Sequence, residues 1–434
     1  MNRPELKIHA KYCIEKMLEA GADKAQVKIV LSDKYELNAA VGKMSLYRTV
    51  TDTEILLTAI KNDKKGTVKI NKLNDKAIDE AAKKVVDAAS SSQPDEANDI
   101  SEFSAAKEFN SGNENPDFEL MYKRMKNFLE YSNEKYPKVI LEESVLDFMG
   151  KKAVFLNSNG TEYHYSTGNY SFTVVFTAKD GNKTSSFNFA HFDSKTLEKE
   201  LYEMANVETV IKQAEKELET KPLPENFVGD LVITPDGLSE FMQVVSYGLS
   251  DSAIYSKTSL FTDKLNQKIA SESFNVSVNP VNENMGINEF VTDDGYEAEN
   301  KVLIENGVLK SYLLTNFGAK KTGYENSKSK NINFVVSAGN KSFNEIIKSV
   351  DKGILLCRFS GGEPAQNGDF SGIAKNSFYI ENGEIKHALS ETMVAGNFAE
   401  MLNDIKNISS ERLDFGNAIM PWMHVGGITV TGNN

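Results

Sequence analysis

The chain has 434 residues, 40% hydrophobic and 26% charged, a profile typical of a globular protein too long for one ordinary core. Its net charge of −13 argues against nucleic acid as the main partner, because phosphate binding requires a concentrated basic surface. No apolar run reaches membrane-spanning length, and "MNRPELKIHAKYC" lacks the apolar core of a signal peptide. We therefore expect no membrane partner and a cytoplasmic location.

The N-terminal part begins with a predicted helix, since apolar residues recur on one face from Leu6 to Met17 and Gly21 follows them. Between Val27 and Ile70 the pattern predicts the strands "VKIVLS", "YELNAAV", "EILLTAI" and "GTVKI". Asn74 is expected to cap a second helix, "DKAIDEAAKKVVDAA". The polar, Pro-bearing stretch "SSSQPDEANDISE" that follows predicts a linker or a long surface loop.

A second section repeats this order, with a helix predicted over about residues 116–136 and then the strands "KVILEESVLDFMG", "KKAVFLNSNG", "TEYHYSTGNYSFTVVFTA" and "SSFNFAHFD". Asn159-Gly160 and Asp180-Gly181 are typical of hairpin turns. A charged helix is predicted over "SKTLEKELYEMANVETVIKQAEKEL". The Pro-rich stretch at about 219–227 is the best candidate for a domain boundary.

After Phe227 the chain is mostly strand and turn. Two similar segments, "LIENGVLKSYLL" and "YIENGEIKHALS", each place Asn-Gly between alternating apolar residues, which predicts hairpins. Two helices are expected, one over 235–249 after the N-cap Thr234 and one over about 397–408 after the N-cap Asn397. In the later helix Met401, Leu402 and Ile405 are expected to be core residues.

These patterns predict an α+β fold in a two-part chain. Residues 1–220 should form an N-terminal part in which helices pack on antiparallel sheet, in two similar sections of about 1–95 and 113–220. Residues 228–434 should form a β-rich C-terminal domain with a few helices.

Metal chemistry has little support in the sequence. The two cysteines lie far apart, and no two of the five histidines share a helix face at zinc-binding spacing. A site assembled across the fold from Cys357 with His387 or His424 stays open. The acidic segment "TDDGYEAEN" is either a solvated turn or a metal or acid–base site.

The stretch "RFSGGEPAQNGDFSG" contains Gly and Pro residues that interrupt a regular strand. It is either an irregular β-connection or a loop that lines a peptide-binding groove, where free backbone groups pair with an extended peptide. On the second interpretation the candidate peptide- or partner-binding residues are Gly361, Gly362, Asp369 and Phe370.

The segment "ITPDGLSEFMQVVSYGLSD" predicts an amphipathic helix whose polar faces carry no strong catalytic group. It is either plain scaffold or a catalytic helix that has lost its chemistry. The order of segments resembles the TldD/PmbA family, also called modulators of DNA gyrase and peptidase U62. The similar segments are "IASESFNVSVNP", "DDGYEAENKVLIENGVLKSYLLTNFGAKKTG", "GDFSGIAKNSFYIENGEI", "ETMVAGNFAEMLNDI" and "VGGITVTG".

The resemblance implies that two branches pair into a heterodimeric, cytoplasmic zinc protease that acts on unfolded peptides or leader regions. The TldD branch carries zinc through an H-E-x-x-x-H helix and a cysteine near the C-terminus, whereas the PmbA/TldE branch lacks these ligands. Alignment with that helix places Gln243 and Gly248 at the two histidines and Val244 at the glutamate. The later segment "DFGNAIMPWMHVGGI" has no cysteine, so the chain resembles the PmbA/TldE branch.

The resemblance therefore implies a non-catalytic subunit, inactive alone, that contributes chamber wall and peptide-binding surface. No zinc is expected on this chain, and one is expected on a TldD-type partner. In isolation the chain could also form a homodimer. Two alternatives stay open: a stand-alone peptide- or protein-binding module of the same fold, and a peptidase with its own non-standard site.

Overall fold

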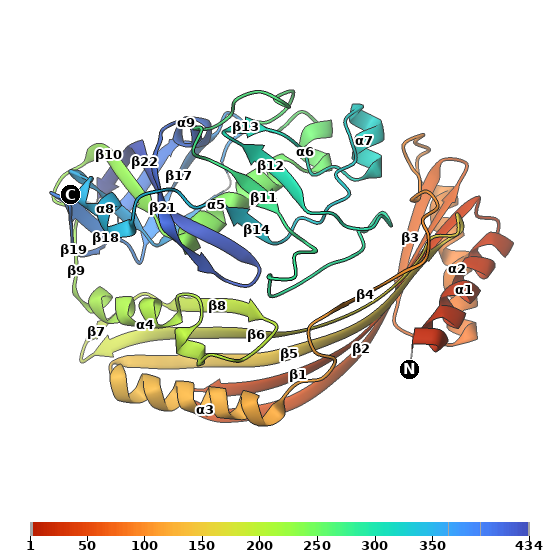
Figure 1. The fold of residues 1–434 in the computed structure, drawn as a ribbon, viewed down its shortest axis with the longest axis horizontal. Coiled ribbons are helices and arrows are strands. Elements are labelled where there is room, and N and C mark those ends of the chain that lie inside the picture. The colour runs from red at the N-terminus through yellow and green to blue at the C-terminus, as the bar shows by residue number, and fades with distance from the viewer. Residues whose placement is uncertain (1–2, 363, 391, 433–434) are drawn as a thin grey trace.

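The computed structural model describes residues 3–362, 364–390 and 392–432, which form two β-sheets with helices packed against them (Figure 1). Helix accounts for 24% of the structure and strand for 42%, which confirms the predicted α+β class with a β-rich C-terminal part. Glu363, inside the predicted groove loop, and Glu391, at the start of a family-like segment, lie outside the described residues.

The first sheet is a long curved layer along the lower side of the molecule in Figure 1. Its strands are β1 (Lys24–Ala40), β2 (Lys43–Lys61), β3 (Lys64–Ile70), β4 (Lys107–Ser111), β5 (Val139–Asn157), β6 (Glu162–Asp180), β7 (Lys183–Thr184) and β8 (Asn188–Ser194). The path runs β3-β2-β1-β5-β6-β4, and β7 and β8 also pair with β6. All of these pairs are antiparallel except β4 with β6.

Two pairs of predicted strands are in fact single strands. The predicted break between "KVILEESVLDFMG" and "KKAVFLNSNG" falls at Gly150, but β5 continues because Gly150 pairs with Asp33 of β1 and Gly168 of β6. Likewise "VKIVLS" and "YELNAAV" both belong to β1, which stays paired with β2 through Asp33 and Lys34. Partners on both sides thus hold an extended backbone where the sequence suggests an interruption.

The two sections of the N-terminal part share this one sheet. Along its length β1 of the first section pairs with β5 of the second, beginning with Gln26 opposite Asn157. One pair of helices packs at one end of the sheet and a second pair at the other (Figure 1): α1 (Arg3–Glu19) with α2 (Asp75–Ser91), and α3 (Phe118–Lys135) with α4 (Val207–Lys216). Helices packed on antiparallel sheet are therefore observed.

The single helix predicted over "SKTLEKELYEMANVETVIKQAEKEL" is wrong. The α-helical part is only the ten residues of α4, with short 3-10 turns at Leu201–Glu203 (η1) and Glu217–Glu219 (η2). Ala205 has a φ of +48°, a left-handed conformation that interrupts a right-handed helix. A reciprocal capping box between Glu200 and Glu203 closes the first short turn.

The second sheet occupies the C-terminal part, above the first in Figure 1. Its strands are β9 (Thr220–Lys221), β10 (Phe227–Ile233), β11 (Val276–Val278), β12 (Lys301–Glu305), β13 (Val308–Leu309), β14 (Phe334–Val336), β15 (Lys352–Leu356), β16 (Arg358–Gly361), β17 (Asp369–Lys375), β18 (Phe378–Glu381), β19 (Glu384–Leu389), β20 (Thr392–Asn397), β21 (Ile405–Asp414) and β22 (Ala418–Gly432). The path is β13-β12-β11-β14-β22-β10-β15-β18-β19-β9. A branch runs from β22 through β20 and β17 to β16, and β21 pairs with β22. The domain boundary at about 219–227 stays a prediction.

Both Asn-Gly hairpins are confirmed. Asn306-Gly307 joins β12 to β13, and Asn382-Gly383 joins β18 to β19. All four residues have positive φ, between 49° and 74°, as a two-residue turn of the primed type requires. Asn can adopt this conformation more readily than most residues, and Gly adopts it without a steric penalty.

Helices punctuate the second sheet: α5 (Pro235–Gly248), α6 (Asp251–Tyr255), α7 (Asn316–Thr322), α8 (Phe343–Lys348) and α9 (Phe398–Asn403). Asn397 caps α9 as predicted, because its Oδ1 accepts from the backbone N–H of Ala399 at 3.0 Å and Glu400 at 3.2 Å. The predicted extension of this helix to about 408 is wrong, since Ile405 begins β21, opposite Val425 of β22. The core assignment of Met401, Leu402 and Ile405 is confirmed.

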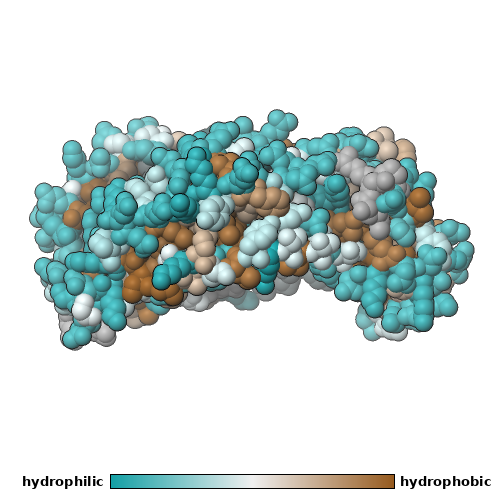
Figure 2. Space-filling view, turned by 90° about the horizontal axis from the view of Figure 1, so that it is seen from below, coloured by the Kyte–Doolittle hydropathy of each residue, from teal (hydrophilic) through white to brown (hydrophobic). Residues whose placement is uncertain are grey.

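The face of the molecule on the α3 side exposes hydrophobic side chains between hydrophilic ones (Figure 2). Partly exposed aromatic and aliphatic side chains on β2 and α3 include Leu46, Tyr47, Phe118 and Tyr122. None of the helices in residues 3–362, 364–390 and 392–432 combines the length and hydropathy that crossing a bilayer requires.

Candidate functional site

The helix that the sequence analysis singled out, α5, is fixed in the main core of the second sheet. Thr234 caps it by accepting from the N–H of Gly237, and Pro235 occupies the first helical position. The apolar residues Leu238, Phe241, Met242 and Val245 are buried, which agrees with the predicted amphipathic helix, and they belong to one large hydrophobic cluster. The opposite side of the helix is left free to line a cavity.

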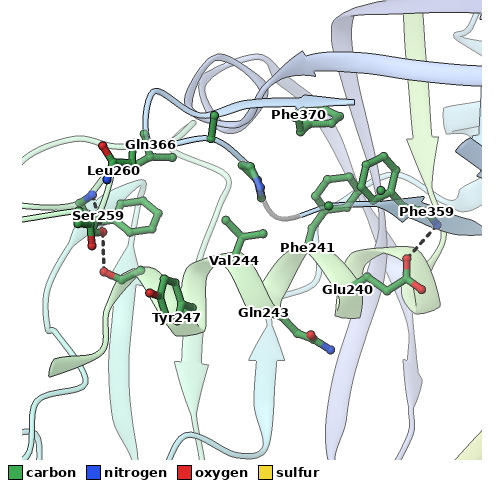
Figure 3. Close-up of a pocket in the computed structure, with 17 residues that line it drawn as sticks. Glu240, Phe241, Gln243, Val244, Tyr247, Ser259, Leu260, Phe359, Gln366 and Phe370 are labelled. Atoms are coloured by element: carbon green, nitrogen blue, oxygen red, sulfur yellow. Dashed lines mark hydrogen bonds between the residues drawn. The ribbon is translucent and has the colours of Figure 1, made fainter. Parts of the chain in front are cut away.

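This cavity, the aromatic pocket, has a volume of about 500 Å³ (Figure 3). Its sides are α5, the segment 258–261 and the loop that follows Phe359. The Phe241 ring lies 5.4 Å from Phe359 and 5.6 Å from Phe370, centroid to centroid. Aromatic rings at these separations attract one another and offer a large apolar surface to a ligand.

The structure brings most of the predicted site residues to this pocket. Gly361, Gly362 and Phe370 line it together with the three positions of the family's zinc motif, Gln243, Val244 and Gly248. Asp369 does not line it. Its carboxylate instead accepts hydrogen bonds from Nδ2 of Asn367 at 2.7 Å and of Asn397 at 3.0 Å, which ties the end of the loop to α9.

Glu240 is the acidic residue of the pocket that the sequence analysis passed over. Its Oε2 accepts a hydrogen bond from the backbone N–H of Phe359 at 2.9 Å (Figure 3). Burial raises the pKa of the Glu240 carboxyl to about 7, against the lowering effects of this hydrogen bond and of Arg358. Glu240 precedes Gln243 by three residues, so its position on the same helix face was available from the sequence.

The three positions of the zinc motif do not fit a zinc ion. Gln243 offers only a neutral amide and Val244 cannot act as a base. At Gly248 a Cβ atom would approach Phe261 Cδ2 at 2.8 Å and Ser259 Oγ at 3.2 Å. Even alanine requires the Phe261 ring to move, so the larger imidazole of histidine has no room in this packing.

No other metal centre is assembled in the described parts of the chain, where no group of three or more His, Cys, Asp or Glu side chains is arranged to hold an ion. The alternative site, Cys357 with His387 or His424, is not part of any such group in the described residues. His424 is buried, with Nε2 at 3.1 Å from Asp230 Oδ2.

The acidic segment 292–300 holds the two parts of the chain together. Glu297 forms an ion pair with Lys107 of β4, and the main-chain oxygen of Asp293 accepts from Nε2 of Gln26 in β1 at 3.1 Å. Asp294 accepts from the hydroxyl of Thr292 at 2.5 Å. The carboxylates of Asp294 and Glu297 are thus occupied by structural contacts.

Comparison with known proteins finds one matching family and several relatives. Residues 228–432 match the family described as the PmbA/TldA metallopeptidase C-terminal domain. A metalloprotease PmbA homolog of Buchnera aphidicola subsp. Acyrthosiphon pisum is 25% identical over 283 residues, 63% of this chain and 63% of the relative. A metalloprotease TldD homolog of the same organism is 28% identical over 191 residues, 41% of this chain and 40% of the relative. The chain thus aligns with less than two thirds of either relative.

Among solved structures, the chain is similar to TldE from Thermococcus kodakarensis, with a TM-score of 0.81. The two share 20% sequence identity, and the similarity covers 98% of this chain and 100% of that one. At this identity the similarity establishes the fold, including both sheets, and leaves the chemistry to be argued from the residues themselves.

Proposed function

The chain belongs to the PmbA/TldD family of metalloproteases, and from this premise we propose that it is the non-catalytic subunit of a two-component zinc protease. In this proposal a TldD-type homologue supplies the zinc ion, and the two chains form a heterodimer in the cytoplasm. This chain contributes part of a chamber wall and a surface that binds unfolded or leader peptides in extended form.

The observation that carries the proposal is the packing at Gly248. A family member that bound zinc through this helix would need a metal-binding side chain there, but the Phe261 ring occupies the space. Gln243 and Val244 supply neither a zinc ligand nor a general base. The α5 helix is therefore suited to packing and to lining the pocket, and catalysis is left to a partner.

The peptide-binding part of the proposal rests on the edge of β16. This strand pairs with β17 on one side and with no other strand in the described structure. The N–H of Phe359 points away from β17, because it donates to Glu240. Gly361, two residues further along, presents its backbone groups on the same side of the strand, where an extended peptide can pair with them.

Aromatic rings beside such an edge provide a place for apolar side chains of the peptide. Phe241, Phe359 and Phe370 line the pocket next to the β16 edge. Pairing through the backbone is independent of sequence, so this arrangement suits unfolded chains of varied composition.

The first experiment is elemental analysis of the purified chain after dialysis against metal-free buffer, alone and with a TldD-type homologue. We expect less than about 0.1 zinc per chain alone, no peptide hydrolysis alone, and hydrolysis when the two chains are combined. One tightly held zinc per isolated chain, or activity without the homologue, would contradict the proposal and favour a peptidase with a non-standard site.

A matched pair of variants tests the pocket within the reconstituted complex. Phe359→Ala should reduce cleavage of an unfolded peptide about tenfold or more without changing the zinc content of the partner. Phe343→Ala removes another partly buried ring, next to Trp422 and away from the pocket, and should leave cleavage unchanged. Equal effects of the two variants would show that the pocket plays no part in peptide recognition.

A second candidate function, a stand-alone peptide-binding module, is favoured by the fact that one chain alone forms the aromatic pocket. It predicts that the isolated chain binds an unfolded peptide and that adding a TldD-type homologue produces neither a complex nor hydrolysis. Size-exclusion chromatography of the mixture therefore separates the two functions.

A further inference from the structure

A second cavity, of about 400 Å³, lies between the two sheets. One side is formed by β8, the segment before α4 and α4 itself. The other side is formed by the start of α5, by Cys357 and Arg358 after β15, and by the hairpin of β21 and β22. This inter-sheet cavity shares Glu240 and Gln243 with the aromatic pocket, so the two adjoin along α5. The function proposed above makes no use of it.

Carboxylates without ion-pair partners face this cavity. Asp236 and Glu240 line it, and Glu217 lies just behind, where Oε2 accepts from Nδ2 of Asn188 at 3.1 Å and of Asn376 at 3.0 Å. Within the described residues, the partners of the three carboxylates are amide or backbone N–H groups, and no ion pair with Lys, Arg or His is found for them. Arg358 lies near enough to lower the pKa of Glu217 and of Glu240, but it forms no ion pair with either of them, so the cavity contains acids that no ion pair neutralises.

The basic side chains that line the cavity are engaged elsewhere. The Arg358 guanidinium lies 4.4 Å from the centroid of the Phe187 ring, and its Nη1 donates to the main-chain oxygen of Phe187 at 3.2 Å. Nε2 of His191 lies 3.2 Å from Oδ2 of Asp193. Neither Arg358 nor His191 forms an ion pair with Asp236 or Glu240.

Two buried amide oxygens add further unsatisfied acceptors to the lining. Asn206 is 4% exposed, and its Nδ2 donates to Oδ2 of Asp236 at 2.5 Å, which fixes the amide orientation and leaves Oδ1 without a donor. Asn376 is 9% exposed, and its Nδ2 donates to Glu217 and to Oδ1 of Asn188, which again leaves Oδ1 without a donor. Buried acceptors without donors are unfavourable, so these two oxygens are available to a ligand that brings hydrogen-bond donors.

Burial shifts the pKa values of the acids that line the cavity. Burial raises the pKa of Asp236 to about 6, even though Asn206 donates a hydrogen bond to its carboxylate. Burial also raises the pKa of Glu240 to about 7, and the nearby Asp236 adds to this rise. A positively charged ligand would lower both pKa values again.

We propose that the inter-sheet cavity binds a primary ammonium group, as carried by a lysine side chain. An ammonium has one positive charge and three donors, which match a carboxylate of Asp236 or Glu240 and the free oxygens of Asn206 and Asn376. A metal ion is less suitable, because no three ligating side chains converge in the described structure. Apolar lining residues such as Val210, Phe415 and Trp422 would cover the aliphatic stem.

The ammonium site also indicates which peptides the protein would bind, and this extension rests on the proposed function. Because the two cavities share Glu240 and Gln243, an extended peptide with an apolar side chain in the aromatic pocket can place a nearby lysine in the inter-sheet cavity. The substrate class would then be unfolded peptides in which lysine lies close to an apolar or aromatic residue.

The ammonium site itself is tested with n-butylammonium, followed by ligand-observed NMR, against the neutral 1-pentanol. We expect n-butylammonium to bind at pH 8 at least tenfold more tightly than 1-pentanol and at least tenfold more tightly than at pH 5. The titratable and charged groups that face the cavity are Glu217, Asp236, Glu240, His191, Cys357 and Arg358. Raising the pH ionises the acids, so the affinity for a cation must rise. Equal affinity at both pH values, or displacement of n-butylammonium by millimolar Mg²⁺ or Ca²⁺, would overturn the inference.

A pair of variants locates the binding. Asp236→Asn should weaken n-butylammonium binding at pH 8 about tenfold. The melting temperature of the variant should equal or exceed that of the natural protein, because burial disfavours the charge that the substitution removes. Glu219→Gln removes a charge from an exposed carboxylate that is paired with Lys183, and should leave the binding unchanged. Equal effects of the two variants would show that the affinity for n-butylammonium depends only on the overall charge of the protein.

Two peptides separate this inference from the proposed function. They share an aromatic residue and differ in having lysine or norleucine near it. If both bind equally well, the ammonium site is wrong and the proposed function stands. If neither binds but n-butylammonium does, the ammonium site stands and peptide binding by this chain is wrong.

Discussion

Replacing Glu217 by glutamine should make the protein more stable at pH 8 and change its stability little at pH 4. Glu217 is 5% exposed, and its Oε2 accepts from Asn188 and Asn376 while Oε1 has no partner. Burial, against those two hydrogen bonds, raises the pKa of its carboxyl from 4.5 to about 7. Glutamine has the shape of the protonated acid, and its oxygen can accept from both asparagines.

The sign of the effect follows from the direction of the pKa change. Between pH 4.5 and 7 the folded state keeps a proton that the unfolded state has lost, so stability is highest below pH 4.5 and falls as the pH rises. Since one pKa unit corresponds to about 1.4 kcal/mol, ionised Glu217 destabilises the folded state by about 3 kcal/mol above pH 7. The variant lacks this penalty.

Urea unfolding at pH 4 and pH 8 measures the difference directly. Glu219→Gln is the matched control, two residues away, because its exposed carboxylate pairs with Lys183 and the pKa of that carboxyl is lowered. The control should not gain stability at pH 8. If Glu217→Gln shows the same difference from the natural protein at both pH values, Glu217 is not protonated in the folded state and the reasoning fails.

Three further predictions concern the pocket and its surroundings. Phe241→Ala should lower the free energy of unfolding by about 3–5 kcal/mol, measured in urea, and a loss below about 1 kcal/mol would contradict the packing of its ring in the core. Asn397→Ala should cost about 1 kcal/mol through loss of the α9 cap, and more through loss of its hydrogen bond to Asp369, whereas Asn397→Ser, which keeps an acceptor, should recover most of the capping part. The pKa of the Cys357 thiol is raised by burial and by the carboxylates of Glu217 and Asp236, so a thiol reagent at pH 8 should modify it at least tenfold more slowly in the folded protein than in urea. Equal rates would show that the thiol is accessible.

Features decided by neighbouring residues were predictable from the sequence. The Asn-Gly hairpins, the Thr234 and Asn397 caps and the apolar stripe of α5 each depend on a few adjacent residues, and each is observed. Continuity of β5 through Gly150 was not predictable from the local sequence. The segment is held extended by pairing with Asp33 of β1, far earlier in the chain, and with Gly168 of β6, the strand that follows. The interruption of the predicted helix at Ala205 likewise depends on a backbone conformation that alanine rarely adopts.

In the candidate site too, some residues could be predicted from the sequence and others required the structure. Gln243, Val244 and Gly248 were found through resemblance, and Glu240 could have been found from its spacing on the same helix. The crowding of Gly248 by Phe261 required the structure. The inter-sheet cavity could not be predicted from the sequence, since Asn206, just before α4, and Asn376, between β17 and β18, are far apart in the chain and no local pattern relates them.

The central position of β22 has a consequence for how the protein forms during synthesis. This strand, Ala418–Gly432, pairs with β10, β14, β20 and β21, so four strands made earlier lack a neighbour until residue 432 has been translated. The first sheet needs only residues up to about 194. We therefore expect the N-terminal sheet to fold while translation continues, and the second sheet to keep exposed edges that chaperones can bind until its last strand emerges from the ribosome.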